Sequence, residues 1–335
     1  MSEQPTLLTG ATGFIGGRLA ERLAGEGRPL RCLVRSGSDT AALRALGAQL
    51  SEGDLRVPRS LADAAAGCAR VVHCAALVSD WATVAEIRAV NVRGTAALLD
   101  AARTTGVRHF VHLSSTDIYG HPGTADVEET FAPARFANWY SRSKLEAERL
   151  VLAAGDAGEL ETSVLRPATV YGPGSREVVL AIARALRRGH MLLIDGGRHV
   201  AGLCHVENAV DFIVAALEQP ASARGAFNLS DGLDVSWRRF TDDLAAGLGC
   251  APARLSLPYR AAAALAFALE HGYRALRRAS GLHLAPLLSR QAVQVLGVEQ
   301  SFSSRRARER LGWQPRVGYA EGLAQTLEWL RRELV

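Results

Sequence analysis

The feature that most constrains the fold is a glycine-rich turn between a short apolar run and a helical pattern near the N-terminus. The apolar run is Thr6-Leu7-Leu8, the turn reads Gly10-Ala11-Thr12-Gly13-Phe14-Ile15-Gly16, and a helix is expected near 16–24. Glycines at this spacing let backbone amides approach a pyrophosphate, which is then held at the positive end of the helix. A second apolar run at 30–34 lies at the right distance, so the segment predicts the first unit of a dinucleotide-binding sheet.

Further apolar runs alternate with alanine-rich helical patterns, which is typical of parallel βαβ units. Strands are expected at 71–74, 110–113 and 162–165, and helices at about 85–104 and 139–153. After Pro167 the rhythm changes, because Gly172-Pro173-Gly174 interrupts the chain. The predicted fold class is α/β. A Rossmann doubly wound parallel sheet spans 1–170, with part of 203–230 rejoining it, and a smaller C-terminal substrate-binding region spans 171–335.

Composition and short sequence patterns argue against a nucleic-acid-binding protein, a metal site and a transmembrane protein. The chain has 335 residues, 48% of them hydrophobic, and its net charge of +5 is dispersed, so no nucleic-acid partner is expected. Five cysteines without a C-x-x-C pair predict reduced thiols in a cytoplasmic protein. His205 beside Cys204 lacks further ligands, so no metal is expected. The longest apolar run, Ala261 to Leu269, is too short to cross a bilayer. Membrane association is not expected, although shallow binding through 259–278 is an alternative.

Lys144 is the one lysine among 39 basic side chains, and it stands four residues after Tyr140. Residues four apart on a helix share a face. A nearby ammonium, together with an oxidised nicotinamide, would lower the pKa of a tyrosine from its usual value of about 10. Tyr140 would then donate a proton to a carbonyl, or accept one from an alcohol. Lys144 would bridge the nicotinamide ribose hydroxyls.

With this pair, the glycine turn makes the chain similar to the extended short-chain dehydrogenase/reductase superfamily. Gly53-Asp54-Leu55 resembles the family's adenine contact, His73-Cys74-Ala75-Ala76 the strand that lines the cofactor, and Asn91-Val92-Arg93-Gly94-Thr95 its central helix signature. The segment 114–120 resembles the active-site serine strand, and 166–173 the segment under the nicotinamide. The resemblance implies a homodimer through two central helices.

The same resemblance assigns the catalytic hydroxyl to Ser115, four residues before Tyr119, with Ser114 as the fallback. Asn91 is explained as well by a structural role that ties strands together as by a role in a water relay. The implied catalytic set is Ser115, Tyr140 and Lys144. The expected cofactor contacts are Gly10, Thr12, Gly13, Phe14, Ile15, Gly16, Arg35, Ser36, Asp54, Leu55, Cys74, Ala75, Ala76, Asn91, Tyr140, Lys144, Pro167, Thr169 and Val170.

The end of the second expected strand bears on the choice of cofactor. An NAD site usually places an acid about twenty residues after the glycine turn, where it binds the ribose 2′-hydroxyl. This chain has Arg35-Ser36 there, which favours the 2′-phosphate of NADP(H). NAD(H) stays open, because Asp39 is near and Arg35 could instead stack on adenine.

Two departures bear on the substrate. Nucleotide-sugar enzymes typically carry an asparagine where this chain has Thr169, and an Arg-Asp-Phe that is missing ahead of His205-Val206. The stretch 227–232 resembles the 3β-hydroxysteroid dehydrogenase-like and dihydroflavonol-reductase-like branch. The resemblance implies ketone and secondary-alcohol interconversion on a bulky apolar substrate (steroid-, flavonoid- or 3-oxoacyl-like). Trp81 and Trp139 are candidate pocket walls, and core or dimer-interface positions explain them equally well. The alternatives are a nucleotide-sugar epimerase or dehydratase, which Asp117 would support, and a non-catalytic dinucleotide sensor.

Overall fold

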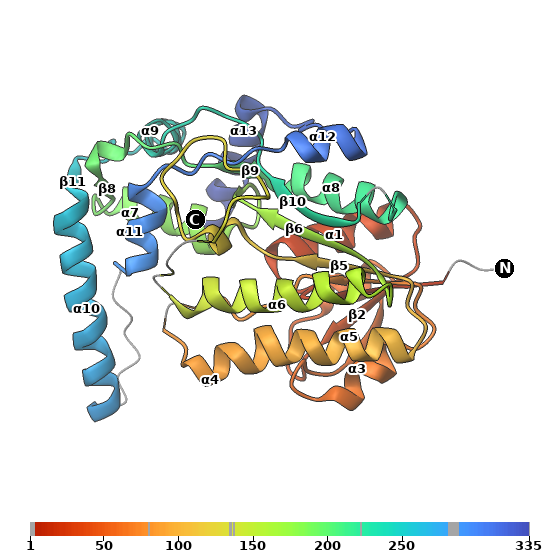
Figure 1. Cartoon of the computed structure of the whole chain (residues 1–335). Coiled ribbons are helices and arrows are strands. Elements are labelled where there is room, and N and C mark those ends of the chain that lie inside the picture. Colours follow the sequence, from red (N-terminus) through yellow and green to blue (C-terminus); the bar gives the residue numbers. More distant parts are fainter. Residues whose placement is uncertain are drawn as a thin grey trace.

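The computed structural model describes residues 4–79, 81–133, 136, 138–221, 223–280 and 288–334, with the side chains of 274–280 left aside. Seven parallel strands form its main sheet in the order β10-β6-β5-β4-β1-β2-β3 (Figure 1). The strands are β1 (Thr6–Thr9), β2 (Leu30–Val34), β3 (Gln49–Glu52), β4 (Arg70–His73), β5 (His109–Leu113), β6 (Glu161–Pro167) and β10 (Gly225–Leu229). This is the predicted Rossmann fold class, extended by β10.

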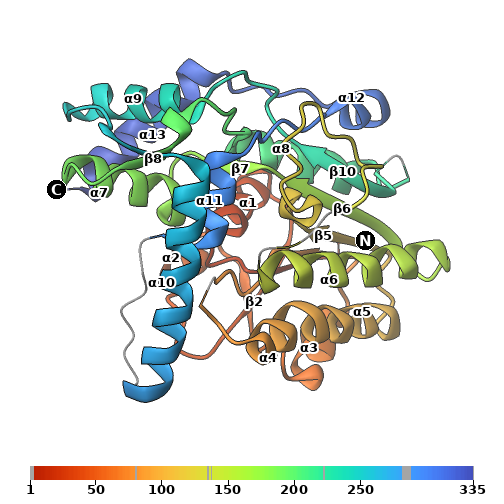
Figure 2. The same cartoon turned by 60° about the vertical axis from the view of Figure 1, so that its left-hand side comes forward.

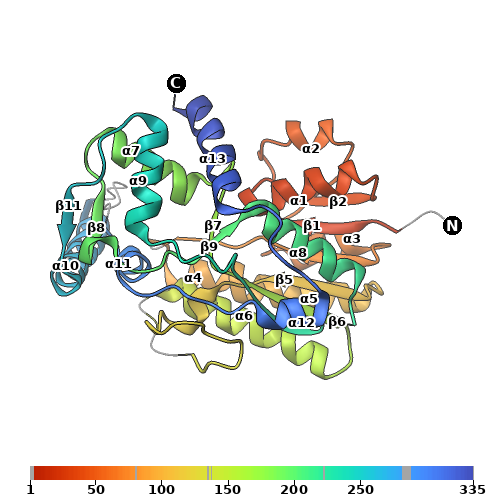
Figure 3. The ribbon, with the colours of Figure 1, turned by 90° about the horizontal axis from the view of Figure 1, so that it is seen from above.

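Helices cover both faces of the sheet, so its strands apart from the edge strand β3 are largely buried (Figures 1 and 3). Strand side chains alternate between faces. Val111 of β5 therefore joins one core and Phe110 the other. The helices on the first face are α1 (Phe14–Gly25) and α8 (Val206–Glu218), and those on the second are α3 (Pro58–Ala65), α5 (Gly94–Thr104) and α6 (Trp139–Asp156). The short helix α2 (Ala41–Ala45) connects β2 to β3.

The long helix expected over 85–104 is not continuous. It consists of α4 (Val84–Ile87), a π-helical turn at Arg88–Arg93 and α5. Thr83 and Glu86 form a capping box that fixes the start of α4. The wide turn places Asn91 inside the helix with its side chain bonded to neighbouring segments, which a regular helical pattern does not reveal.

The other elements form a smaller layer at the end of the sheet where the strands finish (Figures 1 and 2). This layer has a hydrophobic core of its own, which includes Leu193, Trp237 and Phe240. Its strands pair as β7 (Thr169–Tyr171) with β9 (Leu203–His205) and β8 (Leu192–Ile194) with β11 (Leu255–Leu257). Its helices are α7 (Ala181–Arg187), α9 (Trp237–Leu248), α10 (Tyr259–Ser280), α11 (Arg290–Gly297) and α13 (Tyr319–Glu333), while α12 (Arg305–Leu311) packs on β10. The division near residue 170 into two domains stays a prediction.

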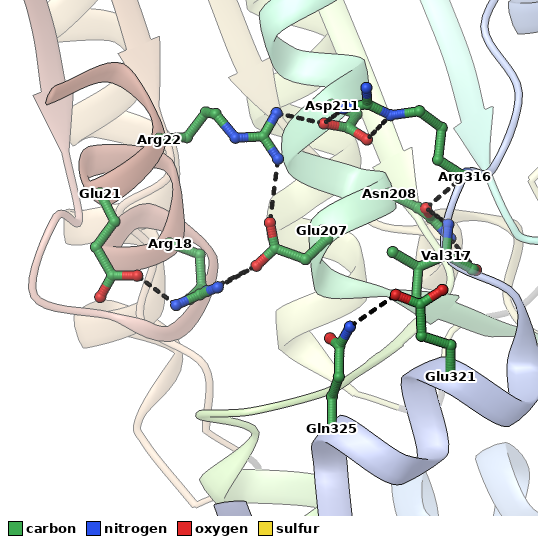
Figure 4. A network of polar contacts seen from close by, with 10 residues as sticks. All are labelled: Arg18, Glu21, Arg22, Glu207, Asn208, Asp211, Arg316, Val317, Glu321 and Gln325. Atoms are coloured by element: carbon green, nitrogen blue, oxygen red, sulfur yellow. Dashed lines mark hydrogen bonds and ion pairs between the residues drawn. The ribbon is translucent and has the colours of Figure 1, made fainter. Parts of the chain in front are cut away.

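An ionic network joins the two layers (Figure 4). Asp211 of α8 accepts from Arg22 of α1 at 2.5 Å and from Arg316, ahead of α13, at 2.6 and 2.7 Å. Burial alone would raise the pKa of Asp211, but the two arginines outweigh it and lower the pKa. Glu207, one turn earlier on α8, accepts from Arg18 at 2.9 Å. These contacts fasten the segment before α13 to the first helix of the sheet layer.

Candidate active site

The predicted glycine turn packs backbone against backbone. Gly10 has a φ of +74°, and a Cβ there would lie 2.7 Å from the amide nitrogen of Ala75. A Cβ on Gly16 would lie 2.2 Å from the carbonyl oxygen of Gly10. Real side chains do not tolerate such distances, so only glycine allows this turn to close against the loop after β4. The structure thus brings Gly10 and Gly16 beside Cys74, Ala75 and the rest of that loop.

The start of α1 is suited to an anion. Gly13 is its N-cap and offers no side chain, and the first turn holds no acidic residue. The first amides of a helix lack partners within the helix and carry partial positive charge. Thr12 is exposed, and Phe14 and Ile15 are partly buried. The uncapped helix end and the close glycine contacts fit the pyrophosphate of a dinucleotide.

The segments expected under the nicotinamide lie next to this cradle. β6 ends at Pro167, and the chain turns into β7, where the backbone amide of Thr169 donates to Gly202 at 2.8 Å. Thr169 and Val170 are partly buried. Further along, a Cβ on Gly174 would lie 3.1 Å from the ring of Phe14, which places the 172–174 turn against the start of α1.

Two arginines surround the carboxylate at the expected adenosine end. Arg35 and Ser36 are exposed after β2, and Asp54 follows β3. The guanidinium of Arg56 donates to both oxygens of Asp54, at 2.9 and 2.7 Å. This pairing, with a weaker contribution from the charge of Arg35, lowers the pKa of Asp54 to about 2. Leu55 is buried against Gly94. Arg56 is a neighbour of this end that sequence reasoning did not single out.

Lys144 lies deep in the site on α6. Its ammonium donates to the carbonyl oxygen of Leu113, at the end of β5. Burial lowers the pKa of Lys144 to about 8, an effect that nearby Cys74 and Glu148 partly oppose. The influence of Cys74 shows that the cofactor-lining loop and the lysine come together.

The pKa of Tyr140 differs in direction from the one predicted from sequence. The sequence predicts that Lys144 and a bound nicotinamide lower this pKa. In the protein alone, burial raises the pKa of Tyr140 well above its usual value, and the carboxylate of Asp117 raises it further. Lys144 is directed at a backbone carbonyl and does not offset these effects. The phenol is therefore held in its protonated form.

The two candidate serines are in different surroundings. Ser115 is partly buried and caps the single turn η2 (Thr116–Tyr119), with its Oγ accepting from the amide of Asp117 at 3.1 Å. Among the described residues no acceptor takes the Ser115 hydroxyl hydrogen, so it is available to a ligand. Ser114 is buried and donates to Glu148 at 2.7 Å, and Glu148 in turn forms a buried ion pair with Arg166 at 2.5 Å. Ser114 is thus committed to a structural network.

Asn91 acts as a tie between elements. Its side chain accepts from the amide of Leu77 at 2.7 Å and donates to the carbonyl of Leu77 at 3.1 Å. It also donates to Ser143 at 2.9 Å, and Ser143 donates to the carbonyl of Tyr140 at 2.7 Å. The π-helical turn is thereby linked to the first turn of the helix that carries Tyr140.

The two tryptophans behave differently. The ring of Trp81 packs edge-to-face on Tyr273 of α10, with centroids 4.8 Å apart. Trp139 is 39% exposed and lies under the guanidinium of Arg142, and its place in a pocket wall stays a prediction. Within the described residues no helix is long and apolar enough to span a membrane, and no three His, Cys, Asp or Glu side chains are grouped as metal ligands.

Sequence reasoning also missed three side chains around Asp117: His121, Asn138 and Gln291. Gln291 stands 174 positions from Asp117 along the chain, so no local pattern signals the contact. A signal for Asn138 did exist, because asparagine is a common N-cap and it directly precedes the helix that starts at Trp139.

Comparison with known proteins agrees with this geometry. The model of the NAD dependent epimerase/dehydratase family matches residues 6–230. The chain is 34% identical to 4-hydroxy-2-methyl-3-oxo-4-farnesyl-3,4-dihydroquinoline-1-oxide ketoreductase of Stigmatella aurantiaca, over 95% of this chain and 94% of that protein. It is 29% identical to 2-alkyl-3-oxoalkanoate reductase of Stenotrophomonas maltophilia (strain K279a), over 95% and 96% of the two.

Among solved structures, MoeE5 in complex with UDP-glucuronic acid and NAD superposes with a TM-score of 0.73 at 29% identity, over 98% of this chain and 99% of that one. The matching stretch of 6–230 includes the glycine cradle, Ser115, Tyr140 and Lys144. The chain therefore belongs to the NAD dependent epimerase/dehydratase family, as an extended short-chain dehydrogenase/reductase.

Proposed function

We propose that the chain interconverts a ketone and a secondary alcohol on a bulky, largely apolar substrate (steroid-, flavonoid- or 3-oxoacyl-like) with NADP(H). The observation that carries the proposal is that the segment bearing Ser115 and the helix bearing Tyr140 and Lys144 come together at the end of β5. Lys144 contacts the end of the strand that leads to Ser115, and Asp117, two residues later, acts on Tyr140. The loop after β4 joins this group to the glycine cradle.

A bound nicotinamide would supply or accept the hydride. For reduction, Ser115 donates a hydrogen bond to the carbonyl oxygen and Tyr140 donates its phenolic proton to the same oxygen. The phenol of Tyr140 is protonated, which is the form that a proton donor needs. The ammonium of Lys144, with a pKa of about 8, is mostly charged at pH 7. It contacts the Leu113 carbonyl in the protein alone; when it binds the ribose hydroxyls of a dinucleotide, its charge would stabilise the phenolate that remains.

The adenosine end supports NADP(H). A 2′-phosphate would be repelled by an isolated carboxylate, but the charge of Asp54 is offset by Arg56 and Arg35. Arg35 and Ser36 are exposed where the phosphate would lie, and arginine is well matched to phosphate geometry. We therefore assign the 2′-phosphate to Arg35 and Ser36, with Arg56 as a further cation nearby.

Two observations support the substrate class. The contact between Trp81 and Tyr273 joins the loop after β4 to α10, which belongs to the predicted substrate-binding region, through two aromatic rings. Both named relatives are reductases of oxo compounds.

All five cysteines are free, which suits a cytoplasmic protein. The homodimer implied by the family resemblance stays a prediction.

The test is a panel of bulky ketones and secondary alcohols, followed by absorbance with NADPH and with NADH. Reduction of at least one ketone, lost in Tyr140→Phe while NADPH affinity stays within about twofold, is the expected result. Arg35→Asp should move the preference toward NADH, and an unchanged NADPH/NADH ratio would refute the phosphate role. Nucleotide sugars belong in the same panel, because MoeE5 was solved with one and Asp117 lies near Tyr140. Turnover of those alone would replace the proposal.

A further inference from the structure

One side chain of the smaller layer contacts two segments of the catalytic site. Gln291, on α11, donates through Nε2 to Asp117 at 2.9 Å and lies 3.2 Å from Nε2 of His121. Its Oε1 accepts from the side-chain amide of Asn138. Asp117 belongs to the turn that Ser115 caps, and Asn138 is the N-cap of α6. Gln291 therefore links the substrate-binding region to the serine turn and to the start of the helix that carries Tyr140.

The orientation of each amide in this network follows from one backbone donor. The amide nitrogen of Ser141 can only donate, and it does so to Oδ1 of Asn138 at 2.8 Å. The remaining nitrogen of Asn138 must then face an acceptor, which is Oε1 of Gln291. The two hydrogens on Nε2 of Gln291 are left for Asp117 and His121. His121 in turn donates from Nδ1 to Gln300 at 3.2 Å. With this assignment each of these donors and acceptors has a partner.

Two layers thus hold the first turn of α6. From the sheet layer, Asn91 donates a hydrogen bond to Ser143, and Ser143 donates one to the carbonyl of Tyr140. From the smaller layer, Gln291 holds Asn138, two residues ahead of Tyr140. The first amides of a helix depend on such caps, because they have no partners inside the helix. Loss of the Gln291 contact would loosen the end of α6 on which the phenol is mounted.

We propose that Gln291 is a positioning residue that sets the orientation of Tyr140 relative to Ser115. The proposal rests on the catalytic roles assigned under Proposed function. Gln291 acts through Asn138 and Asp117, because it forms hydrogen bonds to the groups that hold both catalytic segments in place. Since α11 lies in the substrate-binding region, packing of a substrate there and alignment of the phenol are coupled through this one amide.

The test compares Gln291→Met with Gln294→Met. Methionine matches glutamine in length but cannot form these hydrogen bonds. Gln294 is one turn along the same helix, and its side-chain oxygen has no hydrogen-bond partner among the described residues. A misplacement of about 1 Å can cost roughly 100-fold in rate. We expect Gln291→Met to lower kcat roughly 10- to 100-fold, with the ketone KM and NADPH Kd within about twofold, and Gln294→Met to leave all three unchanged.

Hydrogen exchange supplies a readout that does not depend on activity. Peptides covering 138–145 should exchange faster in Gln291→Met than in the parent, and not in Gln294→Met. Asn138→Ser is the second variant, because serine keeps the cap on Ser141 but is too short to reach Gln291. It should lower kcat as much as Gln291→Met, and the double variant should lose little more.

The outcomes separate this proposal from the proposed function. A kcat within about twofold of the parent in Gln291→Met would overturn the positioning role, and so would unchanged exchange over 138–145. If the parent turned over no ketone in the panel, the proposed function would fail. The exchange contrast between Gln291→Met and Gln294→Met would then still decide whether Gln291 holds the start of α6.

Discussion

Replacing the two adjacent serines one at a time should separate catalysis from stability. The hydroxyl of Ser115 makes one local contact, the cap on the amide of Asp117, and is otherwise available to a carbonyl oxygen. Removing one donor to a developing oxyanion costs about 2.7–4 kcal/mol, or 10²- to 10³-fold in rate. We expect Ser115→Ala to lose that factor in kcat/KM. Loss of the cap should lower the free energy of unfolding by only about 1 kcal/mol.

Ser114→Ala should show the opposite pattern. Its hydroxyl donates at 2.7 Å to the buried carboxylate of Glu148. A hydrogen bond to a charged group contributes about 1.5–3 kcal/mol, so the free energy of unfolding should fall by that amount. Glu148 keeps its two bonds from Arg166, at 2.5 and 3.2 Å, and the ion pair should survive. Turnover should stay within a few-fold of the parent.

The assay is paired: initial rates with NADPH at ketone concentrations from well below to above KM, which give kcat/KM, and urea unfolding of the same preparations. The expected result is a crossed pattern, with activity lost in one variant and stability in the other. If kcat/KM fell 10²-fold in Ser114→Ala and stayed at the parent value in Ser115→Ala, the catalytic hydroxyl would belong to Ser114. Equal loss of activity in both would mean that the Ser114–Glu148 contact positions the catalytic strand, which would refute a purely structural role for Ser114.

Three further results are expected. Gly10→Ala should abolish dinucleotide binding in calorimetry, because its Cβ would lie 2.7 Å from a backbone nitrogen; Gly27→Ala, at a similar φ of +70° with open space around it, should bind normally. Lys144 has a pKa near 8, so kcat/KM for reduction should fall as pH rises above about 8, and any activity left in Lys144→Arg should lack that fall. Asp211→Asn should lower the free energy of unfolding by about 1.5–3 kcal/mol at pH 7 in urea titrations. The pKa of Asp211 is lower in the folded than in the unfolded protein, so its charge stabilises the fold at pH values above the unfolded-state pKa. This stabilisation is lost as the pH falls through the folded-state pKa, so the difference between Asp211→Asn and the parent should shrink in acid.

The parts of the site that sequence predicted are those carried by short segments. The glycine turn specifies a strand, a close backbone contact and a helix start within a few residues, and the structure has all three. The pair Tyr140 and Lys144 lies on one helix as its spacing requires. β3 (Gln49–Glu52) was missed, because as an edge strand with no fully buried residue it lacks the apolar run that indicates a strand.

The sequence by itself determined the Rossmann fold, the family and the placement of Tyr140 and Lys144 on one helix, since each depends on residue types at fixed local spacing. Only the tertiary structure decided which serine is free to act, because successive residues at a strand end point in different directions and Ser114 meets Glu148 from another element. The protonated state of Tyr140 and its link to Gln291 likewise came from folding. Burial and hydrogen bonds between residues far apart in sequence have no local pattern, so they exist only once the layers pack together.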